Sequence, residues 1–85
     1  MSGWPVLTLY GKPGCHLCEE LADLLDELRP AWGFTVGEID ITRDEALFAR
    51  YRYEIPVLVC GTEEVARGRV DARDLVDRLK TFTSP

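Results

Sequence analysis

The feature that most constrains the fold is a short apolar run followed by a tight turn and an amphipathic helical pattern. Residues 6–10 are apolar and β-prone, and the glycine and proline residues that follow end this run. Their near-continuous hydrophobicity predicts a central strand that is buried on both faces. Leucines then recur at spacings of three and four, so residues 15–28 predict a helix that Pro30 and Gly33 bring to an end.

The middle of the chain again shows a strand pattern followed by a helix pattern. Residues 34–41 alternate apolar with polar or small side chains and predict a second strand. Residues 42–51 predict a second helix, with Thr42 as its N-cap and Glu45 three residues later as its partner in a capping box. Residues 56–60 predict a third strand, which begins at a proline.

The last part of the chain completes the pattern. A glycine-containing turn separates the third strand from a short fourth strand at residues 64–67, and the two predict a hairpin. Apolar residues between Val70 and Leu79 predict a last helix, with Asp71 near its start. Residues 81–85 predict a frayed tail.

The predicted order of elements is β-α-β-α-β-β-α. Strands joined through a helix pair in parallel with right-handed crossovers, and the closing hairpin adds an antiparallel edge. The sequence therefore predicts an α/β fold with one four-stranded mixed sheet and helices on both faces. The 85 residues are enough for a single domain, which we expect to span residues 1–85.

The charge balance narrows the possible functions. The chain has 15 acidic and 10 basic side chains and a net charge of −5, whereas a nucleic-acid-binding face is basic. The same balance argues against binding to anionic membranes. No apolar run approaches the roughly 20 residues that cross a bilayer, and the first residues lack a signal-peptide pattern. We therefore expect a cytoplasmic protein that binds neither nucleic acid nor membrane.

Two of the three cysteines form the segment Cys15-His16-Leu17-Cys18. In a reducing compartment this spacing indicates redox chemistry or metal binding. The pair opens the first predicted helix, where unpaired backbone N–H groups and the helix dipole stabilise a thiolate. Such a position lowers the pKa of a cysteine from about 8.5 into a range of roughly 3.5–7.5. Cys15 is therefore the candidate nucleophile, and Cys18, one turn later, is the thiol that resolves its mixed disulfide.

Metal binding by the cysteine pair is the alternative. A structural zinc ion takes four cysteine or histidine ligands, and only His16 and Cys60 remain beyond the pair. His16 lies between the two cysteines and does not easily complete the same tetrahedron, so we expect no zinc site within one chain. One pair from each of two chains would still supply the four thiolates of a shared iron–sulfur cluster. Cys60 itself is expected to be a small buried residue.

Two segments resemble a known family. Residues 9–18 resemble the first strand and active-site loop of glutaredoxins, and residues 55–57 resemble the thioredoxin-fold segment that carries a cis-proline. The resemblance extends from Val6 to Leu79. It implies a thioredoxin fold and a thiol–disulfide oxidoreductase in which Cys15 and Cys18 reduce mixed disulfides of proteins or of glutathione. It also implies a monomer with no tightly bound cofactor and glutathione as a co-substrate.

The resemblance also implies roles for residues around the pair. It implies a cis Ile55–Pro56 bond, with the backbone of Ile55 pairing with substrate as a strand would. Lys12 matches a family lysine that favours the thiolate and attracts a glutathione carboxylate. Arg52 lies near a family position that holds a glutathione carboxylate, and an exposed helix end explains it equally well. His16 either tunes the pKa of the pair or points into solvent.

The sequence departs from the glutaredoxin pattern at two places. His16 and Leu17 replace the usual Pro-Tyr between the cysteines. The usual Gly-Gly before the last helix is also missing, and side chains at Ala66 and Arg67 are expected to crowd a glutathione molecule there. These departures leave open a second class of function, in which the domain binds a metal cluster or docks a partner without turnover.

Overall fold

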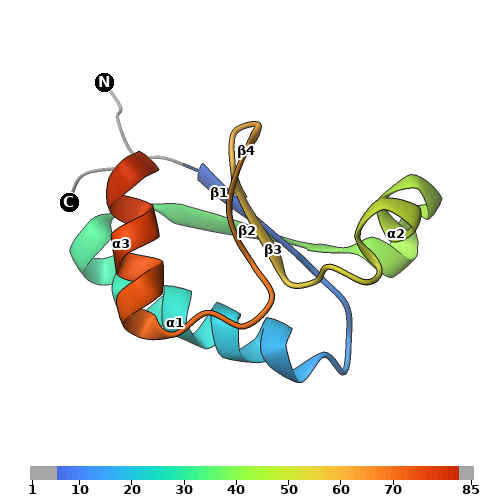
Figure 1. Ribbon diagram of the computed structural model, residues 1–85, viewed down its shortest axis with the longest axis horizontal. Coiled ribbons are helices and arrows are strands. Elements are labelled where there is room, and N and C mark those ends of the chain that lie inside the picture. Colours follow the sequence, from blue (N-terminus) through green and yellow to red (C-terminus); the bar gives the residue numbers. More distant parts are fainter. Residues whose placement is uncertain (1–5, 83–85) are drawn as a thin grey trace.

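The computed structural model describes residues 6–82, which form three α-helices, one short 3-10 helix and four strands (Figure 1). In chain order the elements are β1 (Val6–Gly11), α1 (His16–Trp32), β2 (Thr35–Asp40), η1 (Ile41–Arg43), α2 (Glu45–Tyr51), β3 (Val57–Cys60), β4 (Glu63–Arg67) and α3 (Ala72–Phe82). The predicted order of strands and helices is confirmed.

The strands form one mixed sheet in the order β2-β1-β3-β4. β1 is parallel to β2 and antiparallel to β3, and β3 is antiparallel to β4. β1 is therefore central, as predicted, but it is not buried on both faces. Leu7 and Leu9 are buried, whereas Thr8 and Tyr10 on the opposite face are half-buried. The expectation of two buried faces was wrong because, among residues 6–82, no helix lies over most of that second face.

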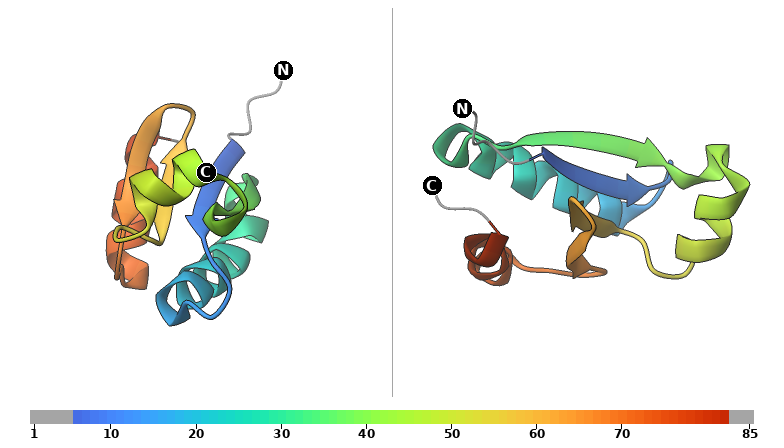
Figure 2. Two further views of the ribbon diagram at one scale, coloured as in Figure 1. Left: turned by 90° about the vertical axis from the view of Figure 1, so that its right-hand side faces the viewer. Right: turned by 90° about the horizontal axis from the view of Figure 1, so that it is seen from above.

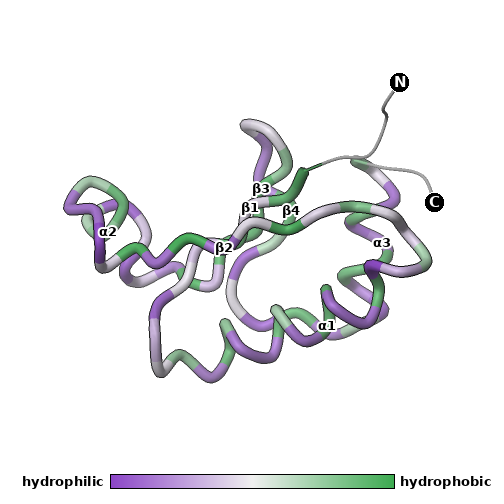
Figure 3. The backbone as a smooth tube through the Cα atoms, turned by 180° about the vertical axis from the view of Figure 1, so that it is seen from behind, coloured by the Kyte–Doolittle hydropathy of each residue, from purple (hydrophilic) through white to green (hydrophobic). Residues whose placement is uncertain are grey.

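Helices α1 and α3 lie on the first face of the sheet and cross steeply, since the right view of Figure 2 shows α3 end-on and α1 along its length. Their buried leucines, Leu21 and Leu25 from α1 and Leu75 and Leu79 from α3, join the strand residues in one core. Figure 3 shows hydrophobic and hydrophilic residues alternating along both helices, as expected for helices with one buried side. Burial of each such leucine stabilises the fold by about 1.5–3 kcal/mol.

Helix α1 runs past the proline that the sequence predicted to end it. Pro30 lies inside the helix, which continues to the buried Trp32. The helix ends at Gly33, whose φ of 81° is left-handed and whose N–H donates to the carbonyl of Arg29 at 2.8 Å. A proline one turn from the end costs only one intrahelical hydrogen bond, and burial of Trp32 offsets that loss.

Helix α2 begins later than predicted. Asp44 is its N-cap, and the carboxylate accepts a hydrogen bond from the N–H of Leu47 at 3.1 Å. Thr42 lies in η1 instead, where its N–H donates to the carboxylate of Asp40 at 2.9 Å. The predicted capping box at Thr42 was therefore wrong, because two aspartates cap two successive short helices. Helix α2 lies beyond one end of the sheet (Figure 1).

Helix α2 contacts the second face of the sheet through one aromatic pair. The rings of Tyr10 in β1 and Tyr51 at the end of α2 stack with centroids 4.7 Å apart and planes 25° from parallel. Helices therefore contact both faces of the sheet, although α2 covers only one end of the second face. The exposed Val6 lies at the other end of this second face, whereas the exposed Ile39 is paired with Tyr10 at the end near α2.

Helix α3 is capped by Asp71, whose carboxylate accepts a hydrogen bond from the N–H of Asp74 at 2.8 Å. The helix extends to Phe82, so the prediction of a frayed tail was wrong for residues 81 and 82. The partly buried Phe82 packs against the core and holds this last turn. Residues 83–85 lie outside the described residues. Within the described part of the chain, none of the helices has the length and apolar character needed to cross a membrane.

Candidate active site

The end of β1 and the start of α1 bring the two cysteines together. Cys15 is the N-cap of α1, with an extended backbone (φ −91°, ψ 107°), and its sulfur accepts a hydrogen bond from the N–H of Cys18 at 3.2 Å. The carbonyl of Cys15 accepts the first helical bond, from Glu19, at 3.1 Å. The sulfur thus occupies the place that a serine or aspartate oxygen takes in an ordinary N-cap.

The sulfurs of Cys15 and Cys18 form a disulfide, and their Cα atoms are 5.2 Å apart. This separation lies in the range of about 4.4–6.8 Å that disulfides usually span. Cys15 is partly exposed, whereas Cys18 is only 8% exposed. Cys15 is therefore the more accessible of the two residues.

The start of α1 also supplies the electrostatics that a reactive thiolate needs. The backbone N–H groups of the first turn lack intrahelical acceptors, and the helix dipole adds positive potential there. The N–H of Cys18 already points at the sulfur of Cys15. When the disulfide is reduced, the same N–H lies where it can donate to an anionic sulfur of Cys15.

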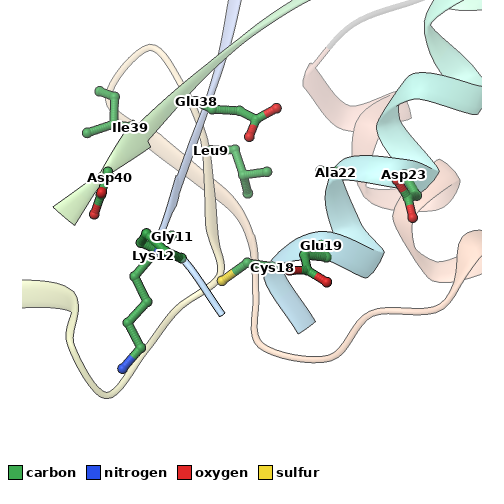
Figure 4. Close-up of a pocket in the computed structure, with 11 residues that line it drawn as sticks. Leu9, Gly11, Lys12, Cys18, Glu19, Ala22, Asp23, Glu38, Ile39 and Asp40 are labelled. Carbon is green, nitrogen blue, oxygen red and sulfur yellow. The ribbon is translucent and has the colours of Figure 1, made fainter. Parts of the chain in front are cut away.

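A pocket of about 420 Å³ opens beside Cys18, between α1, β1 and β2 (Figure 4). Its wall carries four carboxylates, Glu19 and Asp23 from α1 and Glu38 and Asp40 from β2, together with Lys12. Hydrogen bonds from the side chain and the backbone N–H of Thr42 hold the pKa of the Asp40 carboxyl below its usual value. The pocket is therefore predominantly anionic at neutral pH.

The segment before β3 carries the Ile55–Pro56 bond, which is cis. Pro56 is buried, and its carbonyl accepts a hydrogen bond from the N–H of Gly68 at 2.8 Å. The carbonyl of Tyr51 accepts from both Glu54 and Ile55, at 2.7 and 3.2 Å. The N–H of Ile55 is therefore engaged within the protein, and the pairing of its backbone with a substrate stays a prediction.

Three predicted site residues lie on exposed surface. Lys12 lines the pocket beside Cys18, and His16 is the first residue of α1. Arg52 follows α2, and its guanidinium lies over the rings of Tyr53 and Phe48, 4.6 and 5.4 Å from their centroids. The ligand roles of Lys12 and Arg52 and the tuning role of His16 stay predictions.

The region where glutaredoxins carry their glycine pair differs from the sequence-based expectation. Ala66 is fully buried in the core, so it does not crowd a surface ligand. Arg67 is engaged in ion pairs with Glu54 and Glu64. Gly68, with φ 69°, lies beside Pro56 and leaves that stretch of backbone open.

The structure also bears on the third cysteine, Cys60, and on metal binding. Cys60 pairs with Leu7 at the far end of β1 from the redox pair, and it is half-buried rather than fully buried. Among residues 6–82, no three His, Cys, Asp or Glu side chains are grouped so that they could hold a metal ion.

Sequence reasoning missed two residues that shape this site. Gly11, which it treated only as the end of a strand, lies against the sulfur of Cys18. Tyr51 holds the backbone before Pro56, as described above. A signal for Gly11 was available in its position at the strand end just before the cysteine loop, but the packing of Tyr51 had no local signature.

The fold and the cysteine pair define a thioredoxin-fold protein with a Cys-x-x-Cys disulfide at the start of its first helix. Residues 6–80 match the family described as glutaredoxin-like domain (DUF836), and the chain belongs to this family. A curated relative, "Glutaredoxin-like protein YDR286C homolog" from Dictyostelium discoideum, is 26% identical over 82 residues, which cover 89% of this chain and 76% of the relative.

Solved structures show the same fold. Protein Ne2328 from Nitrosomonas europaea superposes with a TM-score of 0.82 at 29% identity, covering 99% of this chain and 96% of that chain. Protein XcR50 from X. campestris gives 0.77 at 29% identity, with 93% and 99% covered. A mutant thioredoxin from Halobacterium salinarum gives 0.70 at 25% identity, with 98% and 78% covered.

Proposed function

We propose that this protein is a dithiol oxidoreductase that reduces mixed disulfides of proteins or of glutathione through Cys15 and Cys18. One observation carries the proposal: the partly exposed Cys15 sulfur accepts a helix N-terminal N–H while bonded to the buried Cys18. This arrangement stabilises a thiolate at the accessible position and keeps a second thiol within bonding distance.

The reaction runs in two exchanges. The Cys15 thiolate attacks one sulfur of the substrate disulfide, and the other sulfur leaves as a thiolate that takes up a proton. The Cys18 thiol then loses its proton to solvent and attacks the Cys15 sulfur. The second substrate sulfur leaves and is protonated. The substrate disulfide has then been reduced by two electrons, and the Cys15–Cys18 dithiol has been oxidised by two electrons to a disulfide. Two glutathione thiols, or the dithiol of a reductase, restore the reduced pair.

The charge beside Cys18 supports one substrate class over the other. Glutathione has two carboxylates and one ammonium and is therefore a net anion, and the pocket beside Cys18 presents four carboxylates against the single ammonium of Lys12. Lysine or arginine side chains near a protein disulfide are attracted to the same pocket. We therefore propose protein disulfides in basic surroundings as the preferred substrates. Their reduction is expected to slow as ionic strength rises, whereas that of matched acidic peptides is not.

The pKa of Cys15 and two serine variants test the proposal. Alkylation of the reduced protein as a function of pH is expected to give a Cys15 pKa well below the free value of about 8.5. Cys15→Ser is expected to abolish disulfide reduction. Cys18→Ser is expected to lose reduction of protein disulfides and to keep removal of glutathione from a mixed disulfide. A Cys15 pKa near that of free cysteine, or full activity in Cys15→Ser, would refute the proposal.

A further inference from the structure

Gly11 lies where the buried sulfur of the redox pair meets the sheet. A Cβ atom built on Gly11 would lie 3.0 Å from the sulfur and 3.2 Å from the Cβ of Cys18. Figure 4 shows the Cys18 sulfur directed toward the end of β1, where Gly11 is. These separations are shorter than ordinary van der Waals contact, so any larger residue at this position forces Cys18 to move.

The backbone conformation of Gly11 does not explain why it is glycine. Gly11 is the last residue of β1 and is paired in register with Asp40 of β2. The glycines with positive φ are Gly14, Gly33, Gly61 and Gly68, and Gly11 is not among them. The missing side chain is therefore needed for space beside Cys18 and not for a special turn.

Space at this point affects the oxidised and the reduced pair differently. In the disulfide, the Cys18 sulfur is tied to Cys15 and cannot retreat from β1. In the dithiol, the same sulfur is free to turn about its Cα–Cβ bond into another staggered position. A methyl group at residue 11 therefore raises the free energy of the disulfide more than that of the dithiol.

We propose that Gly11 is a positioning residue that sets the redox equilibrium of the pair by making room for the Cys18 sulfur in the disulfide. This inference rests on the proposed dithiol function. It assigns to a residue outside the Cys-x-x-Cys segment part of the control over how readily the disulfide forms and how fast Cys18 resolves a mixed disulfide.

The test compares Gly11→Ala with Gly37→Ala in a glutathione redox buffer. Gly37 is a strand residue of β2 with nothing within 4 Å of an added Cβ, so it is a matched control. Gly11→Ala is expected to shift the Cys15–Cys18 equilibrium toward the dithiol by about three- to tenfold, and tenfold corresponds to about 30 mV. Gly37→Ala is expected to leave the equilibrium unchanged. Equal dithiol–disulfide equilibrium constants for the wild type and Gly11→Ala would overturn the inference.

Resolution of a mixed disulfide gives a second readout. In Gly11→Ala, the Cys15–glutathione adduct is expected to persist several times longer before Cys18 displaces glutathione. In the Cys18→Ala background, which lacks the sulfur, Gly11→Ala is expected to leave the attack of Cys15 on a glutathione disulfide unchanged. Slower attack in that background would show that residue 11 acts on Cys15 and would overturn the assignment.

Loss of folding is separated from loss of positioning by denaturant unfolding under reducing and under oxidising conditions. Gly11→Ala is expected to destabilise the reduced protein less than the oxidised protein, because the free Cys18 sulfur can turn away from residue 11 only in the dithiol. An equal loss of stability in the two states would contradict the inference. A wild-type protein that forms no reversible disulfide would instead refute the proposed function, and the two failures are therefore distinguishable.

Discussion

The stacking of Tyr10 on Tyr51 leads us to predict a link between packing and substrate binding. Tyr51 ends α2, and its carbonyl holds the N–H groups of Glu54 and Ile55, directly before the cis-proline. The stack on Tyr10, with centroids 4.7 Å apart, is the aromatic contact that fastens this turn to the sheet. If the segment before Pro56 contacts the substrate as the proposed function requires, weakening the stack should loosen that contact.

The coupling free energy between the two tyrosines can be estimated from the stacked geometry. An offset-stacked aromatic pair contributes about 0.5–1.5 kcal/mol beyond the area it buries. Replacing each tyrosine by leucine keeps most of the buried apolar area, so the coupling between Tyr10→Leu and Tyr51→Leu in a double-mutant cycle should be about 0.5–1.5 kcal/mol. Because Cys15 and Cys18 lie at the start of α1 and not in this turn, the KM for a protein disulfide should rise several-fold while kcat changes little.

The assay is urea unfolding of the wild type, both single variants and the double variant, followed by steady-state kinetics on the same samples. Tyr53→Leu is the control, since Tyr53 is 83% exposed and outside the stack. A coupling energy indistinguishable from zero would refute the stabilising stack. A fall in kcat with unchanged KM would refute the link between the stack and substrate binding.

Two further predictions concern the caps that frame the site. Asp44→Ala should destabilise the protein by about 0.5–2 kcal/mol in urea unfolding, because the N–H of Leu47 loses its acceptor. Asp44→Asn should retain most of the stability, because its side-chain oxygen can accept the same hydrogen bond. Equal losses of stability in the two variants would contradict the role of Asp44 as a cap. Asp40 has a folded-state pKa below its usual 3.8, so its ionised form stabilises the fold above that pH and this contribution disappears as the pH falls through the folded value. In an NMR titration, Thr42→Val should raise the pKa of Asp40 by removing the hydroxyl donor, and an unchanged pKa would show that this hydrogen bond is not its cause.

The two active-site cysteines were predictable because their signal is local. A strand, a glycine–proline turn and an amphipathic pattern place Cys15 at a helix start whatever the rest of the chain does, and the structure has it as the N-cap. The cap positions were less predictable. Thr42 and Asp44 are both good N-caps by residue type, and the structure has Asp44 as the cap of α2 and Thr42 within η1, which Asp40 caps.

The proline in α1 shows the limit of local rules. Pro30 is a strong helix-ending signal, yet the helix continues because Trp32 is buried against the core. Propensity terms of about 3 kcal/mol for one proline compete with burial of a large aromatic side chain, and only the folded molecule shows which is larger.

Local sequence patterns were enough to predict the order of strands and helices, the family resemblance and a cysteine at a helix start, because each depends on residues close together in the chain. The residues that surround the sulfurs became apparent only in the folded chain. Gly11 against Cys18, Tyr51 on Tyr10 and the carboxylates of β2 beside α1 are contacts between separate elements. Such contacts are set by how the helices pack on the sheet, and no local pattern encodes that packing.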